Sequence, residues 1–319
     1  MKHIFEQLRH QYPWPDVTGY SAHDFTLGGG GRELIERELM ALSQQKGGAP
    51  LYMLEVGCFM CASTRRWLQK FDNLYIVGVD PWPDSLKEQV LKYVDRPLLN
   101  RLYPHEKDQQ QFVEDVRTQG PMETGLANLK GFEDRFIPVK AYAPDAFTPL
   151  AEAGFIPDLV YIDGAKQIED LEEASRLWPT AKITGDDWHW GRTYGYPMRK
   201  IVKKFASNHG FGIEANWATW VLHKDMDTSL IIQAAHKSDL HKLTLLVPDQ
   251  DAESVKSYYQ ENLSRTLVAY DGKKLVGAGT LKGGKIDLIR IAQQTTVKAV
   301  ETVLTDALER IVAATEHKS

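Results

Sequence analysis

Four aspartates are the residues of this sequence whose type and spacing could do chemistry. Asp80, Asp163 and Asp186 each follow a short apolar run within a residue or two, and Asp187 comes directly after Asp186. Carboxylates gathered at one place repel one another unless a cation lies among them, and carboxylate oxygens are ligands that Mg²⁺ prefers. Asp163, Asp186 and Asp187 therefore predict a divalent-metal site. In the alternative, Asp186 caps its own loop and Asp163 binds a ligand hydroxyl directly.

A glycine turn precedes the first of these acids. Gly57 follows the apolar run 51–56, which contains Glu55, and a glycine there lets the backbone pass close to a ligand. Ser63 can cap the helix that follows. Asp80 comes about 20 residues after Gly57, where an acid accepts ribose hydroxyls in dinucleotide-binding folds. The pair predicts a nucleoside site no more strongly than it predicts an ordinary α/β turn.

Two side chains are candidates for a general base. Lys166 could take a proton if desolvation lowers its pKa, or it is a solvated lysine at a helix start. His189 could also serve, or it hydrogen-bonds within its loop. Trp82 either packs on a bound nucleoside or on the sheet, and Trp188 and Trp190 either line an acceptor pocket or belong to the core.

Cys58 and Cys61 form a C-x-x-C pair inside the glycine turn, and they are the only cysteines. A zinc site would need two more ligands, and the sequence holds no second pair. We therefore expect these cysteines to pack against their neighbours. Two cysteines are also too few for a disulfide framework, which predicts a cytoplasmic, reduced protein.

The elements that must position these residues alternate along the chain. An alternation of apolar runs with helical stretches predicts a parallel sheet with helices on both faces. Two closing runs leave no room for a helix between them, which predicts an antiparallel last strand. The fold class expected is α/β, with a doubly wound, seven-stranded, mostly parallel sheet. Its strands are expected at 51–56, 74–79, 136–139, 159–162, 181–184, 211–214 and 218–222.

The length of 319 residues suggests two domains. We expect the first at 1–225, with a lead at 1–50 and a polar, helical insertion at 81–133. The second, at 226–319, is expected to be a small α+β module. Its Asp271-Gly272 pair predicts a β-hairpin, and a last helix is expected at 296–314.

Four motifs resemble those of class I S-adenosylmethionine-dependent methyltransferases. They are Glu55-Val56-Gly57, Val79-Asp80-Pro81-Trp82, Ile162-Asp163-Gly164 and Gly185-Asp186-Asp187-Trp188. They are most similar to the small-molecule O-methyltransferases of the catechol, macrolide-sugar and cephalosporin-tailoring kind. The resemblance covers 51–224. Cys61 departs from it, because the family usually has its second loop glycine there, and so do Ala165 and Lys166, which replace acidic or histidine residues of many sugar-modifying relatives.

The resemblance implies S-adenosylmethionine as cofactor and Mg²⁺ or another divalent cation as metal. The implied cofactor residues are Glu55, Gly57 and Asp80, with Ser63, Trp82 and Asp163 as further candidates. The implied metal ligands are Asp163, Asp186 and Asp187. Lys166, three residues after the first metal aspartate, takes the place of the base in catechol-type members.

The function expected is metal-assisted methyl transfer to a hydroxyl of a small molecule or sugar. The alternatives are a metal-independent methyltransferase with His189 or Asp163 as base, and a non-catalytic nucleotide-binding or scaffold protein. The net charge of −5 argues against a nucleic-acid partner, and no apolar run approaches the ~20 residues of a membrane span.

The C-terminal module weakly resembles part of a GNAT acyltransferase. The stretch 293–298, where that fold has its glycine-rich CoA loop, contains no glycine. We therefore expect docking, homo-oligomer formation or substrate cover from this module rather than acyl transfer.

Overall fold

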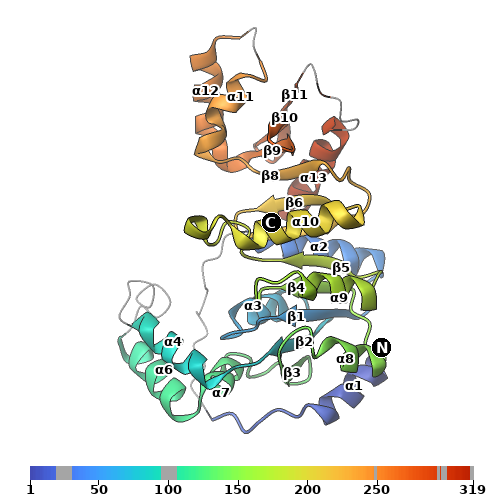
Figure 1. The fold of residues 1–319 in the computed structure, drawn as a ribbon, viewed down its shortest axis with the longest axis vertical. Helices are drawn as coiled ribbons and strands as arrows, with labels where there is room; N and C mark the ends of the chain where they lie inside the picture. Colours follow the sequence, from blue (N-terminus) through green and yellow to red (C-terminus); the bar gives the residue numbers. More distant parts are fainter. Residues whose placement is uncertain (19–30, 95–105, 248–249, 293–294, 296–299, 317–319) are drawn as a thin grey trace. The chain divides into compact units, whose positions relative to one another are not determined.

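A computed structural model gives the fold of the chain (Figure 1). It describes residues 1–18, 31–94, 106–247, 250–292, 295 and 300–316. The chain divides into two compact units: the first comprises residues 1–29 and 41–186, and the second residues 30–40 and 187–319. No helix in the described ranges has both the length and the apolar character needed to cross a bilayer.

The first unit is built on five parallel strands in the order β5-β4-β1-β2-β3. Their sequences are short apolar runs, because a strand of a parallel sheet is covered on both faces. β1 pairs with both β2 and β4, so the order of strands reverses beside it. All five predicted strands are confirmed within a residue or two: β1 Leu51–Val56, β2 Leu74–Asp80, β3 Phe136–Lys140, β4 Leu159–Ile162 and β5 Lys182–Gly185.

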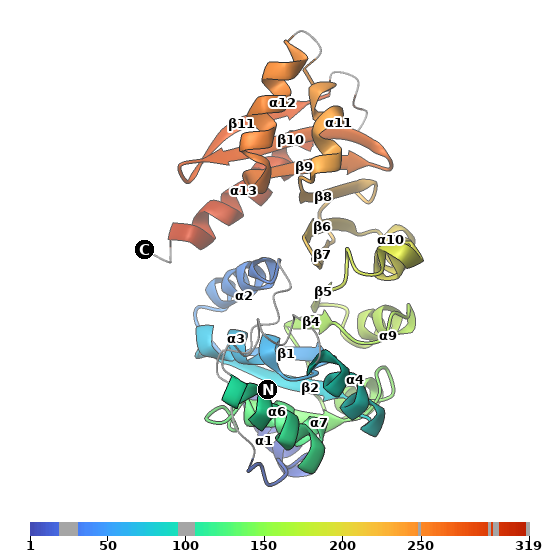
Figure 2. The same cartoon turned by 90° about the vertical axis from the view of Figure 1, so that its left-hand side faces the viewer.

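Helices cover both faces of this sheet. Figure 2 shows α3 (Ala62–Lys70) and α9 (Glu169–Leu177) on opposite sides of the strands. The insertion after β2 is helical, as predicted. The remaining helices of the unit are α1 Lys2–Gln11 and α8 Phe147–Glu152, together with the insertion's α4 Asp84–Val94, α6 Glu106–Thr118 and α7 Pro121–Ala127.

The second unit contains six strands in the order β11-β10-β9-β8-β6-β7. β6 and β7 are antiparallel, as predicted for the closing pair, and the Asp271-Gly272 turn joins antiparallel β9 and β10. Helix α13 buries Leu304 and Leu308 against one face of β9 and β10, and Figure 2 shows α12 over the other face. The strands are β6 Gly212–Asn216, β7 Thr219–His223, β8 Leu230–Ala234, β9 Thr266–Asp271, β10 Lys274–Lys282 and β11 Lys285–Ile291.

The helical elements of the second unit lie between and after these strands. They are α10 Pro197–His209, α11 Leu240–Thr244, α12 Ala252–Glu261 and α13 Val300–Glu316, with short 3-10 turns η1 Arg192–Tyr194, η2 Lys237–Asp239 and η3 Leu263–Arg265. Helix α2 (Glu33–Gln45) crosses the division, since residues 33–40 belong to the second unit and 41–45 to the first. Most of the stretch 293–298 and residues 28–30 lie outside the described residues.

The seven-stranded sheet is not confirmed. β6 pairs with β7 on one side and runs parallel to β8 on the other, so the strands continue beyond the seven that were predicted. The physical reason is that an unpaired strand edge exposes backbone N–H and C=O groups, and β8 satisfies those of β6. The pairing also joins residues on both sides of the predicted domain boundary at 225/226.

Candidate functional site

The turn after β1 is held from inside the first unit. Glu55 is buried in the middle of the sheet, and Thr64 Oγ1 donates a hydrogen bond of 2.6 Å to its Oε2. Gly57 has φ +86°, and a Cβ there would lie 2.4 Å from the carbonyl oxygen of Asp163 and 2.8 Å from the nitrogen of Gly164. Only glycine fits this approach. The turn after β1 therefore lies directly against the turn after β4.

Asp80 organises the two turns that follow β1 and β2. Its Oδ2 accepts the backbone N–H of Phe59 at 2.8 Å, and its Oδ1 accepts that of Trp82 at 2.7 Å. Burial raises the pKa of the Asp80 carboxyl, and the hydrogen bonds from Phe59 and Trp82 oppose that rise without cancelling it. Asp80 was predicted to bind a ribose, but both of its carboxylate oxygens already accept a protein N–H. A nucleoside hydroxyl would have to use their second lone pairs.

Trp82 lies in the interior of the first unit. Only 1% of its surface is exposed, and its Nε1 donates to the carbonyl oxygen of Phe59 at 2.8 Å. Both residues have left-handed backbone conformations, with φ 35° at Trp82 and 49° at Phe59. Of the two roles expected for Trp82, the structure places it in packing and in a hydrogen bond that joins two turns.

We expect Asp80→Asn to lower the free energy of unfolding by about 1–3 kcal/mol. The amide offers one acceptor oxygen in place of two, so one of the backbone N–H groups of Phe59 and Trp82 would face an NH₂ group. Urea denaturation at pH 7 measures the change. Asp72→Asn, at an exposed position, is the matched control and should change stability by less than about 0.5 kcal/mol. An Asp80→Asn protein as stable as the wild type would contradict the role of Asp80 as a clamp.

The start of helix α3 differs from the prediction. The residue at the N-cap is Cys61, in a left-handed conformation with φ 57° and with no side-chain capping bond, so Ser63 lies inside the helix and is not its cap. Cys58 and Cys61 are free and buried. Burial, and then the charge of Glu55, raise the pKa of both thiols well above the usual value. Protonated, buried thiols agree with the packing role expected for this pair.

The turn after β4 carries the predicted base. Asp163 is half-buried, and Lys166 Nζ donates to the carbonyl oxygen of Gly164 at 3.0 Å. The lysine therefore folds back over its own turn, toward the strand ends and not along helix α9. The ammonium group of Lys166 therefore lies beside Gly164, one of the two residues whose backbone Gly57 approaches.

A carboxyl group that the sequence reasoning missed lies beside this turn. Asp170 is completely buried, its Oδ1 accepts from Gln167 Nε2 at 2.8 Å, and its Oδ2 has no hydrogen-bond partner in the described part of the chain. Gln167 Nε2 also donates to the carbonyl oxygen of Ala143 at 3.0 Å, which ties the turn after β4 to the turn after β3. Burial raises the pKa of Asp170 to about 6.

We expect native stability to fall as the pH rises from about 4 to 6, because the folded pKa of Asp170 lies above its unfolded value of 3.8. The contribution of this group is about 1–3 kcal/mol. Asp170→Asn should remove that part of the pH dependence in urea denaturation at pH 4, 5, 6 and 7. Glu169→Gln, an exposed neighbour whose charge adds a smaller part of the rise in pKa, should leave most of it in place. Identical pH profiles for Asp170→Asn and the wild type would rule out Asp170 as the cause.

The loop after β5 belongs to the second unit from Asp187 onward. Asp186 is buried, and Asp187 has a left-handed backbone with φ 66°. Trp188 is a core residue, whereas Trp190 is 51% exposed. Of the two aromatic candidates for an acceptor pocket, one is therefore packed away and the other faces out.

Arg199 fixes His189 in this loop. Arg199 Nη2 lies 2.5 Å from His189 Nδ1, and its Nε donates to the carbonyl oxygen of Trp188 at 3.3 Å. Partial desolvation and the positive charge of Arg199 lower the pKa of His189 to about 4, so the ring is neutral at pH 7. Because Arg199 can only donate, Nδ1 is the acceptor and Nε2 carries the proton. In this arrangement His189 offers an N–H group and no free base.

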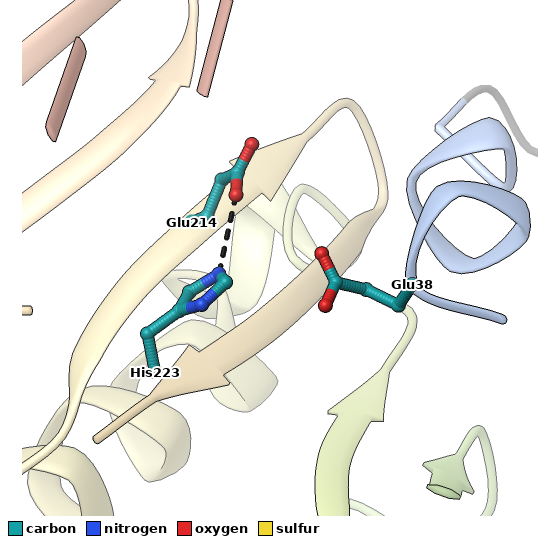
Figure 3. Close-up of side chains that lie close together, drawn as sticks. All are labelled: Glu38, Glu214 and His223. Atoms are coloured by element: carbon teal, nitrogen blue, oxygen red, sulfur yellow. Dashed lines mark hydrogen bonds and ion pairs between the residues drawn. The ribbon is translucent and has the colours of Figure 1, made fainter. Parts of the chain in front are cut away.

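The predicted metal ligands do not form a three-residue ligand group. Across the described residues, three such side chains have ligand atoms within 4.8 Å of one another only at Glu38, Glu214 and His223, in the second unit (Figure 3). Asp163, Asp186 and Asp187 are not among them.

The group in Figure 3 already faces a cation. Arg37 Nη2 donates to Glu214 Oε2 at 2.7 Å and to Glu38 Oε1 at 3.2 Å, and His223 Nε2 lies 3.1 Å from the same Glu214 oxygen. All four side chains are buried. Burial alone would raise the pKa of Glu214, but Arg37 and His223 hold it well below its usual range. These residues join α2 to the β6–β7 hairpin as a buried ionic network.

No family model matches the sequence, and no curated protein matches it. Solved structures similar to the chain include the precorrin-6y C5,15-methyltransferase of Geobacter metallireducens, with 17% identity, a TM-score of 0.31, and coverage of 55% of this chain and 72% of that one. Another is the precorrin 8W decarboxylase of Methanobacterium thermoautotrophicum, with 12% identity, a TM-score of 0.33 and coverage of 64% and 77%.

A third is a SAM-dependent methyltransferase of Agrobacterium tumefaciens, with 11% identity, a TM-score of 0.30 and coverage of 54% and 50%. Similarities of this size carry no argument about the family or activity of this chain. The function is therefore inferred from the residues of this chain.

Proposed function

We propose that the first unit binds S-adenosylmethionine and transfers its methyl group to a hydroxyl of a small molecule. The observation that supports this most is the close packing of Gly57 against the backbone of Asp163 and Gly164. This contact lies where the strand order reverses between β1 and β4, and α/β sheets bind ligands at the carboxyl ends of the strands at such a point. The resemblance of the four strand-end motifs to methyltransferases points to the same ligand.

In this proposal the chain's residues hold the cofactor and move one proton. The cofactor supplies an electrophilic methyl group on a sulfonium. Glu55, Gly57, Asp80 and Asp163, with Ser63 at the helix start, would hold it, while Trp82 supports the turn from behind. Lys166 Nζ would take the proton of the acceptor hydroxyl, so that the acceptor oxygen could bond to the methyl group that the cofactor supplies.

Lys166 is the base in this proposal, and His189 is not. The Nδ1 lone pair of His189 already faces Arg199, so His189 has no free lone pair for the proton of a substrate. A divalent ion on Asp163, Asp186 and Asp187 stays a prediction, and no step depends on it.

A second candidate function is a non-catalytic scaffold on the same fold. It is favoured by one observation: the polar groups of the turn after β1 are bonded within the protein. Asp80 accepts from Phe59 and Trp82, and Asn128 Nδ2 donates to the carbonyl oxygen of Met60 at 2.9 Å. A turn satisfied in this way is stable without a ligand.

Calorimetric titration with S-adenosylhomocysteine, with and without EDTA, separates the two functions. Binding under both conditions supports the methyltransferase proposal without a metal, and binding lost with EDTA returns the metal to it. No binding in either condition would favour the scaffold.

We expect Lys166→Met to lower methyl transfer by about 100-fold or more and to leave S-adenosylhomocysteine binding unchanged, because only the base is removed. The measurement is release of S-adenosylhomocysteine from S-adenosylmethionine, with catechols and sugars as acceptors. Lys2→Met, at an exposed position on α1, is the control. Equal turnover in Lys166→Met and the control would exclude Lys166 as the base.

A further inference from the structure

The charge of the chain is unevenly distributed. The net charge is −5, yet residues 188–213 contain five Lys and Arg residues and not one Asp or Glu. This segment forms the loop before α10, the whole of α10, seen in yellow in Figure 1, and the start of β6. The whole-chain charge, which argued against a nucleic-acid partner, hides this basic segment. The distribution of charge is the better guide to a polyanion site.

Two exposed aromatic rings lie in the same segment. Trp190 and Tyr194 are stacked, with ring centroids 6.3 Å apart and planes at 26°, and they are 51% and 75% exposed. Gly191 and Gly195, with φ 69° and 72°, enclose the turn that carries Tyr194. Exposed apolar side chains that lie next to one another, as these two rings do, mark binding surfaces more often than single exposed residues do.

Arg199 fixes this loop against α10. Its guanidinium lies 4.9 Å from the ring centroid of Trp188 and 4.6 Å from that of Tyr196, and its Nε donates to the Trp188 carbonyl oxygen. The loop is therefore held at both ends of the stretch that carries Trp190. Aromatic rings on a fixed loop cost less entropy to use in binding than rings on a mobile one.

Cations without acidic partners lie beside the loop. Lys203 is one helical turn after Arg199, and Lys273 lies in the β9–β10 turn. Partial burial, and then the charges of Arg199 and Lys273, lower the pKa of Lys203, so the three cations interact electrostatically. Within the described ranges, neither Lys203 nor Lys273 makes an ion pair with an acid.

Asp239, an acid that interacts with Arg199 and His189, is already engaged within the protein. The charge of Asp239 favours the protonated forms of both Arg199 and His189, whereas the charge of His236 disfavours protonation of His189. The Asp239 carboxylate is buried. Its Oδ1 accepts a hydrogen bond from the Tyr270 hydroxyl at 2.6 Å, and its Oδ2 accepts one from the backbone N–H of His236 at 2.8 Å. It is turned inward, so the positive charge of Lys203 and Lys273 is left for an outside partner.

We propose that this surface, made of Trp190, Tyr194, Arg192, Arg199, Lys203 and Lys273, binds single-stranded nucleic acid. Bases stack on the two exposed rings, and Lys203 and Lys273 bind the phosphates. Exposed rings beside cations are the pattern of single-strand binding, since every base has a face that can stack and every linkage carries a negative charge. An acidic peptide would use the cations but not the rings. The proposal does not rest on methyl transfer.

Fluorescence anisotropy with labelled 12-nucleotide oligo(U) and oligo(dT), at several salt concentrations, tests the proposal on the full chain. Trp190→Ala and Tyr194→Ala should each weaken binding about tenfold and leave the salt dependence unchanged. Lys203→Ala and Lys273→Ala should each reduce the slope of log affinity against log salt by about 0.7. Lys285→Ala, an exposed lysine of β11, should behave as the wild type.

Two results would overturn the proposal. One is no detectable binding of either oligonucleotide at 50 mM salt. The other is binding that heparin displaces and that Trp190→Ala and Tyr194→Ala do not weaken, which would indicate unspecific attraction of a polyanion. Thermal unfolding of each variant shows that the affinity changes are not caused by loss of structure.

Discussion

Replacing Gly57 by alanine is expected to lower the free energy of unfolding by about 3 kcal/mol or more. Two causes act together. Alanine at φ +86° adopts a left-handed conformation that costs about 1–2 kcal/mol, and its Cβ would lie 2.4 Å from the backbone oxygen of Asp163, where overpacking adds about 1–3 kcal/mol. The neighbour is backbone, so it cannot rotate away as a flexible side chain would. Urea denaturation measures the loss.

Gly47→Ala separates the two causes. Gly47 also has a positive φ, of +60°, but an added Cβ would meet no atom within 4 Å. Its cost should therefore be the conformational part alone, about 1 kcal/mol. Equal losses in Gly57→Ala and Gly47→Ala would show that the turns after β1 and β4 are not in close contact. The main observation behind the proposed cofactor site would then be lost.

Replacing Arg37 by methionine is expected to cost about 3–5 kcal/mol of stability. The change leaves Glu38 and Glu214 buried without the guanidinium that contacts both. Removing one partner of a buried ion pair costs more than the pair itself contributes, because the remaining charge has neither water nor a counter-ion. Thermal and urea unfolding both report this loss.

The matched control is the double variant Arg37→Met with Glu214→Gln. It also removes one of the two stranded charges, that of Glu214, so it should recover part of the stability. Glu214 has a lowered pKa in the folded state, so its contribution is present above the unfolded pKa of 4.5 and is lost as the pH falls below it. Arg37→Met should weaken this acid-dependent loss. A double variant no more stable than Arg37→Met would contradict the network.

The strands of the first unit could be predicted because their pattern is strong. A parallel strand covered on both faces must be a short apolar run, and the runs at Leu51–Val56 and Leu159–Ile162 cannot be mistaken for an amphipathic helix. Asp80, Asp163 and Asp186 were placed at strand ends for the same reason. The pairing of β6 with β8 was not predicted, because the sequence of β6 does not say which strand will pair with its second edge.

The contacts of the site residues were beyond the sequence. The position of Asp80 at a strand end is compatible with binding a ribose or with accepting two backbone N–H groups. The choice depends on the left-handed turns at Phe59 and Trp82, and neither residue type favours that conformation. The short Asp80-Pro81-Trp82 sequence, in which an aspartate can accept the N–H two residues later, was the one available signal.

The ionic network was missed for a different reason. Arg37 and Glu38 lie on a helix beside Leu34, Ile35 and Leu39, and charged residues in such a helix are usually assigned to the solvated face. All of them are buried, because the β6–β7 hairpin supplies Glu214 and His223. A partner so distant in the sequence cannot be inferred from local spacing. The only sequence signal for a buried ionic network was that charged residues alternate with apolar residues in this helix.

The span of that ion pair has a consequence during synthesis. Arg37 and Glu214 are 177 residues apart, so the arginine leaves the ribosome long before its carboxylate exists. At about 5–20 residues per second, the nascent chain waits roughly 10 to 35 seconds for it. During that interval the helix is translated but has no place to bury its charges. The second unit can therefore complete its folding only after β6 has been translated, although the start of α2 is synthesised much earlier.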